Sequence, residues 1–178
     1  MNPFFITGLP RSRTKWFSEY FDGIPGVRCL HQGINGCYST KSLLNKMEKA
    51  SKHNKYPCVG NSDSLLVLLN ISEYATVIVD RDLDEVLHSL EQNTDLILDD
   101  AIINNYKKMN EMKKTMPGFH IAFDRVDNNL DAIHEYLIDI PFDPDYAITM
   151  VTKNITVNKS EKLSLITRYR LLDPQMAA

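Results

Sequence analysis

The residues whose types and spacing best suggest chemistry lie in a turn near the N-terminus. An apolar run, Phe4-Phe5-Ile6, leads into Thr7-Gly8-Leu9-Pro10-Arg11-Ser12-Arg13-Thr14-Lys15-Trp16. Backbone N–H groups at a helix start lack partners within the helix, and the positive end of the helix dipole adds to their field. Arginine and hydroxyl side chains bring further charge and donors to the same place. The stretch therefore predicts a strand, a phosphate-binding loop and a helix start.

The loop differs from the lysine-containing phosphate loop of ATP- and GTP-binding proteins. That motif reads G-x-x-x-x-G-K-[ST], and neither Arg11 nor Lys15 falls at the lysine position after Gly8. A strand-turn-helix joint whose arginines merely face solvent is the alternative interpretation. Taken alone, the loop predicts an anion site without identifying the anion.

A second candidate site follows the apolar strand Ala75–Asp80. Arg81 comes directly after this strand, and Ser89 lies eight residues later in an amphipathic segment. In open α/β sheets, ligands bind beyond the carboxyl ends of the strands. A guanidinium at that position can grip a phosphate through two parallel hydrogen bonds, and a hydroxyl can add a third.

The elements that must position these residues alternate as strands and helices, which predicts an α/β fold with a parallel sheet. The expected strands are Pro3–Thr7, Val27–His31, Tyr56–Gly60, Ala75–Asp80 and Phe119–Asp124. The expected helices are Thr14–Asp22, Thr40–His53, Ser64–Asn70, Leu83–Gln92, Leu96–Met116 and Leu130–Ile140, and a shorter segment, Asp145–Lys153, follows them. Ser39 or Thr40 and Asp82 suit helix N-caps. The charged residues of 96–116, Lys113 among them, predict a solvated helix face.

The two motifs together resemble the nucleotide-binding elements of sulfotransferases that use 3'-phosphoadenosine 5'-phosphosulfate (PAPS). The chain looks most like small bacterial and bacteriophage sulfotransferase-like proteins, whose loop often reads G-L-P-R-S-R-T, as residues 8–14 do here. The resemblance implies that the loop holds the 5'-phosphosulfate. It also implies that Arg81 and Ser89, which have the family's spacing, hold the 3'-phosphate.

The resemblance further implies a fold and a set of roles. The fold is a P-loop-like three-layer sandwich, with a five-stranded parallel sheet in the order 2-3-1-4-5 and helices on both faces. Arg11 takes the place of the family's catalytic cation, while Ser12, Arg13 and Thr14 surround the 5'-phosphate. The whole cofactor-binding set is Gly8, Leu9, Pro10, Arg11, Ser12, Arg13, Thr14, Lys15, Trp16, Arg81 and Ser89. The cofactor is PAPS, or PAP after transfer, and no metal is expected.

A sulfuryl transfer needs a general base near the acceptor. Asp63 and His31 are the candidates, and Asp124 is a weaker third. Asp63 could instead cap the following helix, and His31 could simply end a strand. Trp16 could stack on a base, although an aromatic residue on an apolar helix face more often packs inward.

Length and composition set the remaining expectations. The chain has 178 residues, of which 43% are hydrophobic and 24% charged, and this suits one α/β domain over residues 1–157. Residues 158–178 would form a tail or a docking arm. As a docking arm, this segment is a candidate contact in a homo-oligomer. The net charge of −3 argues against broad nucleic-acid binding. Cys29, Cys37 and Cys58 suggest reduced thiols. No apolar run suits a membrane span, so we expect a cytoplasmic protein, in the host cytoplasm if phage-encoded.

Three functions are compatible with the sequence. The first is a sulfotransferase that transfers a sulfuryl group from PAPS to an unknown hydroxyl or amine acceptor. The second is a P-loop nucleotide or nucleoside kinase, which would need a lysine on the β/γ-phosphates. The third is a non-catalytic nucleotide-binding protein that engages a phage or host partner. The third stays open because two features of the larger sulfotransferases are absent: a histidine at the end of the strand that precedes the Ala75 strand, and a C-terminal R-K-G-x-x-G-D-W-type segment.

Overall fold

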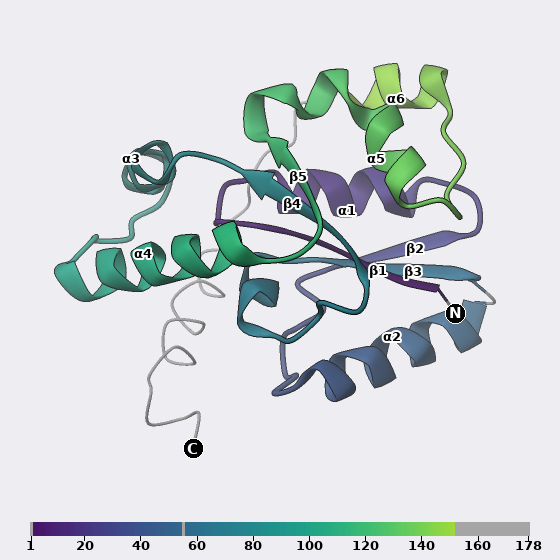
Figure 1. Ribbon diagram of the computed structural model, residues 1–178, viewed down its shortest axis with the longest axis horizontal. Coiled ribbons are helices and arrows are strands. Elements are labelled where there is room, and N and C mark those ends of the chain that lie inside the picture. Colours follow the sequence, from purple (N-terminus) through teal and green to yellow (C-terminus); the bar gives the residue numbers. More distant parts are fainter. Residues whose placement is uncertain (1, 55, 152–178) are drawn as a thin grey trace.

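One parallel sheet organises the chain in the computed structural model, which describes residues 2–54 and 56–151 (Figure 1). Its strand order is β2-β3-β1-β4-β5, and all four pairings are parallel. The strands are β1 (Asn2–Gly8), β2 (Val27–His31), β3 (Cys58–Ser62), β4 (Ala75–Asp80) and β5 (Phe119–Ala122). The predicted α/β fold class and sheet order are confirmed.

Helices cover both faces of the sheet and make a three-layer sandwich (Figure 1). One face carries α1 (Thr14–Asp22), α5 (Leu130–Tyr136) and α6 (Pro144–Val151). The other face carries α2 (Thr40–Asn54), the 3₁₀ helix η1 (Ser64–Leu68), α3 (Leu83–Asn93) and α4 (Asp100–Thr115). A second 3₁₀ helix, η2 (Phe123–Asn128), follows β5 directly.

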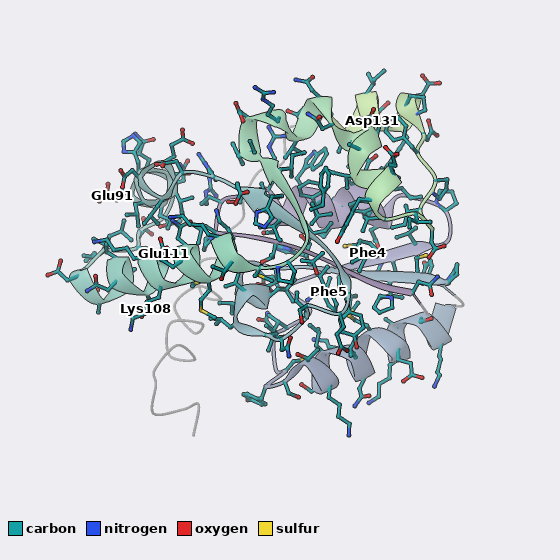
Figure 2. All side chains as sticks on the ribbon, viewed as in Figure 1. Phe4, Phe5, Glu91, Lys108, Glu111 and Asp131 are labelled. Carbon is teal, nitrogen blue, oxygen red and sulfur yellow. The ribbon has the colours of Figure 1, made fainter. Side chains whose placement is uncertain are left out.

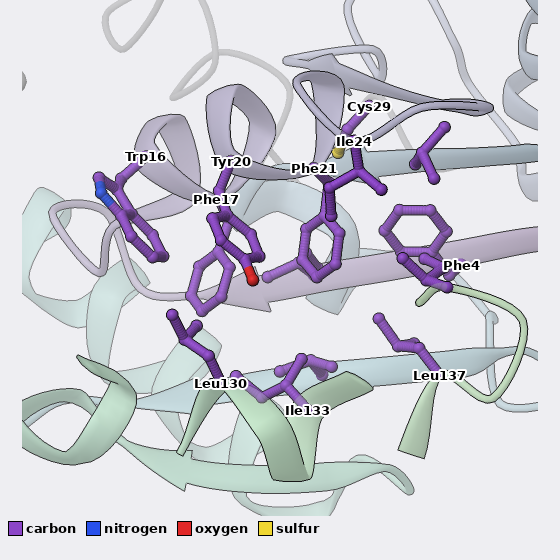
Figure 3. Packing of buried hydrophobic residues seen from close by; sticks show 14 of the residues in the cluster. Phe4, Trp16, Phe17, Tyr20, Phe21, Ile24, Cys29, Leu130, Ile133 and Leu137 are labelled. Atoms are coloured by element: carbon purple, nitrogen blue, oxygen red, sulfur yellow. The ribbon is translucent and has the colours of Figure 1, made fainter. Parts of the chain in front are cut away.

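The alternation of side chains along β1 divides the core into two sides. Phe4 and Ile6 join the cluster under α1 and α5, whereas Phe5 joins the cluster under α2, and Figure 2 shows Phe4 and Phe5 on either side of the strand. Full burial of each such side chain contributes about 1.5–3 kcal/mol. Figure 3 shows the first cluster, in which aromatic residues of α1 meet aliphatic residues 130, 133 and 137. This packing fixes α1, and with it the loop that precedes α1.

Several helix starts have the caps that their sequences predict. Asp82 accepts hydrogen bonds from the backbone N–H groups of Asp84 and Glu85, at 2.9 and 3.3 Å. Ser39 Oγ accepts from the N–H of Ser42 at 3.2 Å. The helix expected from Leu96 begins only at Asp100, because Asp99 caps it through the N–H of Ile102 at 2.8 Å. Each cap contributes about 0.5–2 kcal/mol.

Other element boundaries differ from the predictions for local reasons. The third strand begins at Cys58 because the N–H of Tyr56 donates to Ser51 O at 3.1 Å and closes the end of α2. It extends to Ser62, so Asp63 follows the strand directly. The fifth strand ends at Ala122, where the chain turns into η2. The helix starting at Leu130 ends at Tyr136, and the last helix covers Pro144–Val151. Segment 158–178 and the boundary at 157 lie outside the described residues.

Lys113 corrects the expectation of a fully solvated face on α4. It is only 2% exposed, and its Nζ lies 3.1 Å from Asp80 Oδ1 at the end of β4. Asp80 Oδ2 lies 2.9 Å from His120 Nδ1 on β5. A buried ammonium group is tolerated when it is paired. The pair ties α4 to the strand end that carries Arg81.

Candidate anion-binding site

The turn between β1 and α1 approaches the neighbouring strand β4 closely. A Cβ on Gly8 would lie 2.8 Å from Val79 O and 2.9 Å from Ser12 Cβ, so the turn requires a glycine at this position. Arg11 and Arg13 both have left-handed backbone, with φ of 68° and 61°. That conformation costs a non-glycine residue about 1–2 kcal/mol, and strain of this kind concentrates at ligand-binding turns. Left-handed residues in a turn also direct successive N–H groups into one concavity, which suits an anion.

The N-terminus of α1 has the features of an anion site. Arg13 occupies the N-cap position and makes no side-chain cap hydrogen bond to α1. Ser12 is fully buried, and its Oγ has no hydrogen-bond partner among the described residues. An unsatisfied buried hydroxyl costs about 1–3 kcal/mol. An orphaned donor under a loop rich in guanidinium groups fits the phosphate that the sequence predicts there.

Arg81 and Ser89 converge on the loop although they lie far from it in sequence. Arg81 donates from Nη1 to Arg11 O at 2.7 Å, across 70 positions. Arg11 Nε donates to Ser89 Oγ at 3.3 Å, across 78 positions. Two guanidinium groups and a hydroxyl thus meet where β1 and β4 end side by side. Glu85, with Oε2 3.4 Å from Arg81 Nε, offsets part of this charge from a largely exposed position.

The helix η2 closes the other side of the loop. The Phe123 ring lies 4.3 Å from the guanidinium carbon of Arg81 and 5.0 Å from that of Arg13. Such cation–π contacts are worth about 0.5–1 kcal/mol at partly exposed positions. Arg13 also forms an ion pair with Asp127, between Nη1 of the arginine and Oδ1 of the aspartate. Phe123 therefore contacts two cations of the candidate site.

Asp63 lies beside the end of β1, the strand that leads into the loop, and both its backbone and its side chain are hydrogen-bonded. Its backbone N–H donates to Ile6 O at 3.0 Å, and its carbonyl accepts from Thr7 Oγ1 at 2.9 Å. The side chain is 1% exposed, and Oδ1 accepts from the N–H of Leu65 at 3.0 Å. Asp63 thus caps η1, as the alternative interpretation predicted. Asp63 neighbours β1, the strand that leads into the loop, and it therefore remains a candidate base.

His31 lies further from the loop. It ends β2 and pairs in register with Ser62 of β3, which in turn pairs with Ile6 of β1. Two strand spacings separate β2 from β1, which amounts to about 9–10 Å between strand axes. The histidine is half-buried. It shares the carboxyl edge of the sheet with the loop without being its neighbour.

The other predicted loop residues differ in burial and in hydrogen bonding. Thr14 accepts a 2.7 Å hydrogen bond at its carbonyl from Ser62 Oγ, which ties α1 to β3. Leu9 is fully buried in the cluster under α3 and α4, and Pro10 is also buried, so their contribution to a ligand is confined to the backbone. Lys15 is half-buried.

Trp16 packs inward. Its side chain is 7% exposed, its ring stacks on Tyr20 with centroids 5.2 Å apart, and its Nε1 donates to Met150 O at 3.0 Å. The packing favours the core role over stacking on a base. Asp124, the weakest candidate base, is exposed in η2.

Cysteine, histidine and acidic side chains are the remaining groups that could carry chemistry of their own. Cys29, Cys37 and Cys58 are free, and burial raises the pKa of the Cys29 and Cys58 thiols, which keeps them protonated. In residues 2–54 and 56–151, no group of three or more histidine, cysteine or acidic side chains is arranged to hold a metal ion. Over the same residues, every helix is too short or too polar to cross a membrane.

Sequence reasoning missed Phe123 and Asp127. Both lie just beyond β5, at the edge where the carboxyl ends of all five strands meet. The rule that ligands bind at this edge could have singled out Phe123, since it directly follows the strand. Nothing in the local sequence links Asp127 to Arg13, because their contact spans 114 positions.

Similarity to known proteins is found in the fold and not in the sequence. The sequence matches no protein-family model and no curated protein sequence. Among solved structures, the fold is similar to that of mouse sulfotransferase SULT7A1 complexed with PAP, at 13% identity and a TM-score of 0.47. The match covers 84% of this chain and 62% of the sulfotransferase chain. A similarity this low carries no functional conclusion, so the function must be inferred from the residues of the site.

Proposed function

We propose that this protein is a sulfotransferase that uses PAPS as donor and a hydroxyl or amine compound as acceptor. One observation carries the proposal: Arg81 and Ser89 both contact Arg11 at the end of β1. The sequence motifs that resemble a 5'-phosphosulfate loop and a 3'-phosphate clamp thus lie together. A nucleotide with phosphate groups on both sides of its ribose matches this arrangement better than a single anion does.

Each residue of the site has a proposed role. Bound PAPS would supply the sulfuryl group and leave as PAP. Arg11 and the N–H groups at the start of α1 stabilise negative charge on the 5'-phosphate, the kind of electrostatic stabilisation that dominates group transfer. Arg81 and Ser89 hold the 3'-phosphate through charge-assisted hydrogen bonds. Asp63, adjacent to the loop, is the preferred base, and His31 is the second candidate.

A nucleotide-binding protein without transfer activity is the second candidate function. Asp63 is engaged as a helix cap, and His31 belongs to a strand two positions away from β1. Neither residue is held in an orientation that only a base would need. This candidate shares the nucleotide site and differs only in the chemistry.

Thermal-shift titrations with PAP, PAPS and ATP, each with Mg²⁺ and with EDTA, test the proposal. A ligand that binds only the folded state stabilises it by about 2.7 kcal/mol at one hundred times its Kd. We expect PAP to raise the Tm equally with Mg²⁺ and with EDTA. Stabilisation by ATP only with Mg²⁺ would indicate a kinase, and no response to any nucleotide would refute both enzyme readings. PAP release from PAPS with a panel of phenols, sugars and amines then separates the enzyme from the binding protein.

A further inference from the structure

Arg13 is already paired within the protein. Its guanidinium forms the ion pair with Asp127 and lies 5.0 Å from the Phe123 ring and 5.9 Å from the Trp16 ring. The two charged side chains are 28% and 30% exposed. Arg13 also has left-handed backbone, so the loop and η2 together define the position of this cation.

An anion that binds the loop must share Arg13 with Asp127. A guanidinium has five N–H donors, and Asp127 engages Nη1, so the other donors can address a ligand. The carboxylate nevertheless cancels much of the positive field that an anion would otherwise experience. The ion pair is also partly solvated, which keeps its net stability small and lets it open.

Asp127 has space into which it can turn. It borders a cavity of about 440 Å³ between η2, α5 and α6, which is also lined by Asp131, Phe142 and Ile148. Asp131, labelled in Figure 2, is exposed at this surface. The Asp127 side chain is already 30% exposed within the ion pair, so a carboxylate that leaves Arg13 can stay in contact with solvent.

We propose that Asp127 is an internal counter-ion that weakens anion binding at the loop by competing for Arg13. Asp127 is a positioning residue in this role, because it acts on the ligand through Arg13. The inference rests on the proposed function only for the identity of the nucleotide. The competition itself applies to any phosphate-containing anion at the loop.

The test is the substitution Asp127→Asn, which keeps the shape of the side chain and removes its charge. Calorimetric titrations use inorganic pyrophosphate and PAP as separate probes. We expect the variant to bind both about three- to tenfold more tightly, the range for a partly screened charge pair a few ångströms apart. Should Asp127→Asn fail to fold by circular dichroism, Asp127→Ser provides a second variant.

Two controls decide the outcome. Asp131→Asn makes the same change in net charge at the same cavity and should leave pyrophosphate affinity within about twofold, since an exposed charge that forms no ion pair with Arg13 is screened. In an Arg13→Gln background, Asp127→Asn should bring no gain, because the competition acts through Arg13. Four results would overturn the proposal. Asp127→Asn could bind pyrophosphate no more tightly than the unmodified protein, or Asp131→Asn could show an equal gain. The gain could also persist in the Arg13→Gln background, or no variant could bind pyrophosphate. If pyrophosphate responds as expected and PAP does not bind, the counter-ion role stands and the nucleotide proposal fails.

Discussion

Replacing Arg81 with methionine is the sharpest test of the candidate site. Methionine keeps an unbranched, flexible apolar stem that can contact Phe123, although it is shorter than arginine, and it removes the charge and the donors. Arg81 is the residue that joins the end of β4 to the loop after β1, through its 2.7 Å hydrogen bond to Arg11 O. The substitution should therefore lower both the free energy of unfolding and the affinity for PAP, and the two losses can be measured separately.

The loss of stability should be small. Arg81 loses one hydrogen bond from a charged donor and a cation–π contact at 4.3 Å. The hydrogen bond is worth at most about 1.5–3 kcal/mol and the ring contact about 0.5–1 kcal/mol, and the methionine regains part of the ring contact. The ion pair with Glu85, 63% exposed, adds little. We expect a decrease of about 1–2 kcal/mol in the free energy of unfolding, measured by urea denaturation.

The loss of PAP affinity should be larger. Removal of a charge-assisted, bidentate phosphate contact costs about 2–3 kcal/mol, which corresponds to a Kd about 30- to 150-fold higher. Isothermal titration calorimetry measures this Kd at a temperature where both proteins are folded. Arg125→Met is the matched control, because Arg125 is an exposed arginine of η2 outside the site. Its PAP affinity should stay within about twofold of the unmodified protein, as for a screened surface charge.

Two results would refute this reasoning. Unchanged PAP affinity in Arg81→Met would mean that the 3'-phosphate does not bind between Arg81 and Ser89. An equal loss in Arg125→Met would mean that PAP responds to overall charge and not to a specific clamp.

Three further predictions concern the loop, the core and the chemistry. Gly8→Ala should lower the free energy of unfolding by about 1–3 kcal/mol in urea, because the new Cβ would lie 2.8 Å from Val79 O; an unchanged midpoint would contradict the required close approach. Burial lowers the pKa of His134 below its usual 6.5, so the unfolded state binds more protons, and stability should fall as the pH drops below about 6.5. His134→Gln should flatten that slope between pH 7 and pH 5, and an unchanged slope would assign it to other groups. If Asp63 is the base, Asp63→Asn should lower kcat at least about 100-fold with PAP affinity retained, whereas an effect of that size in His31→Gln instead would reverse the assignment.

Local sequence predicted the elements well where one physical signal dominated. The helix Thr14–Asp22 and the strands Val27–His31 and Ala75–Asp80 have the predicted boundaries, because apolar periodicity and strand composition act within a few residues. Asp82 caps its helix because capping needs only the next three residues. The third strand was misplaced at both ends, since Tyr56 is drawn into the end of α2 by a hydrogen bond to Ser51 O.

Long-range contacts were harder to predict. Lys113 has a charged neighbourhood typical of a solvated helix face, yet it is buried against Asp80 of another element. Trp16 suited both a core position and a base-stacking position, and its packing against Tyr20 favours the core. In each case the decisive partner is absent from the local sequence.

Side-chain type, periodicity and short spacing are local properties, and they are enough to predict the α/β fold and the two motifs whose arginines and hydroxyls suit phosphate groups. The contacts of Arg81 and Ser89 with Arg11, and of Phe123 and Asp127 with Arg13, exist only in the folded chain. Parallel pairing of β1 with β4 and of β4 with β5 brings their carboxyl ends to one edge. Contacts across 70 to 114 positions depend on that pairing, and no local pattern encodes them.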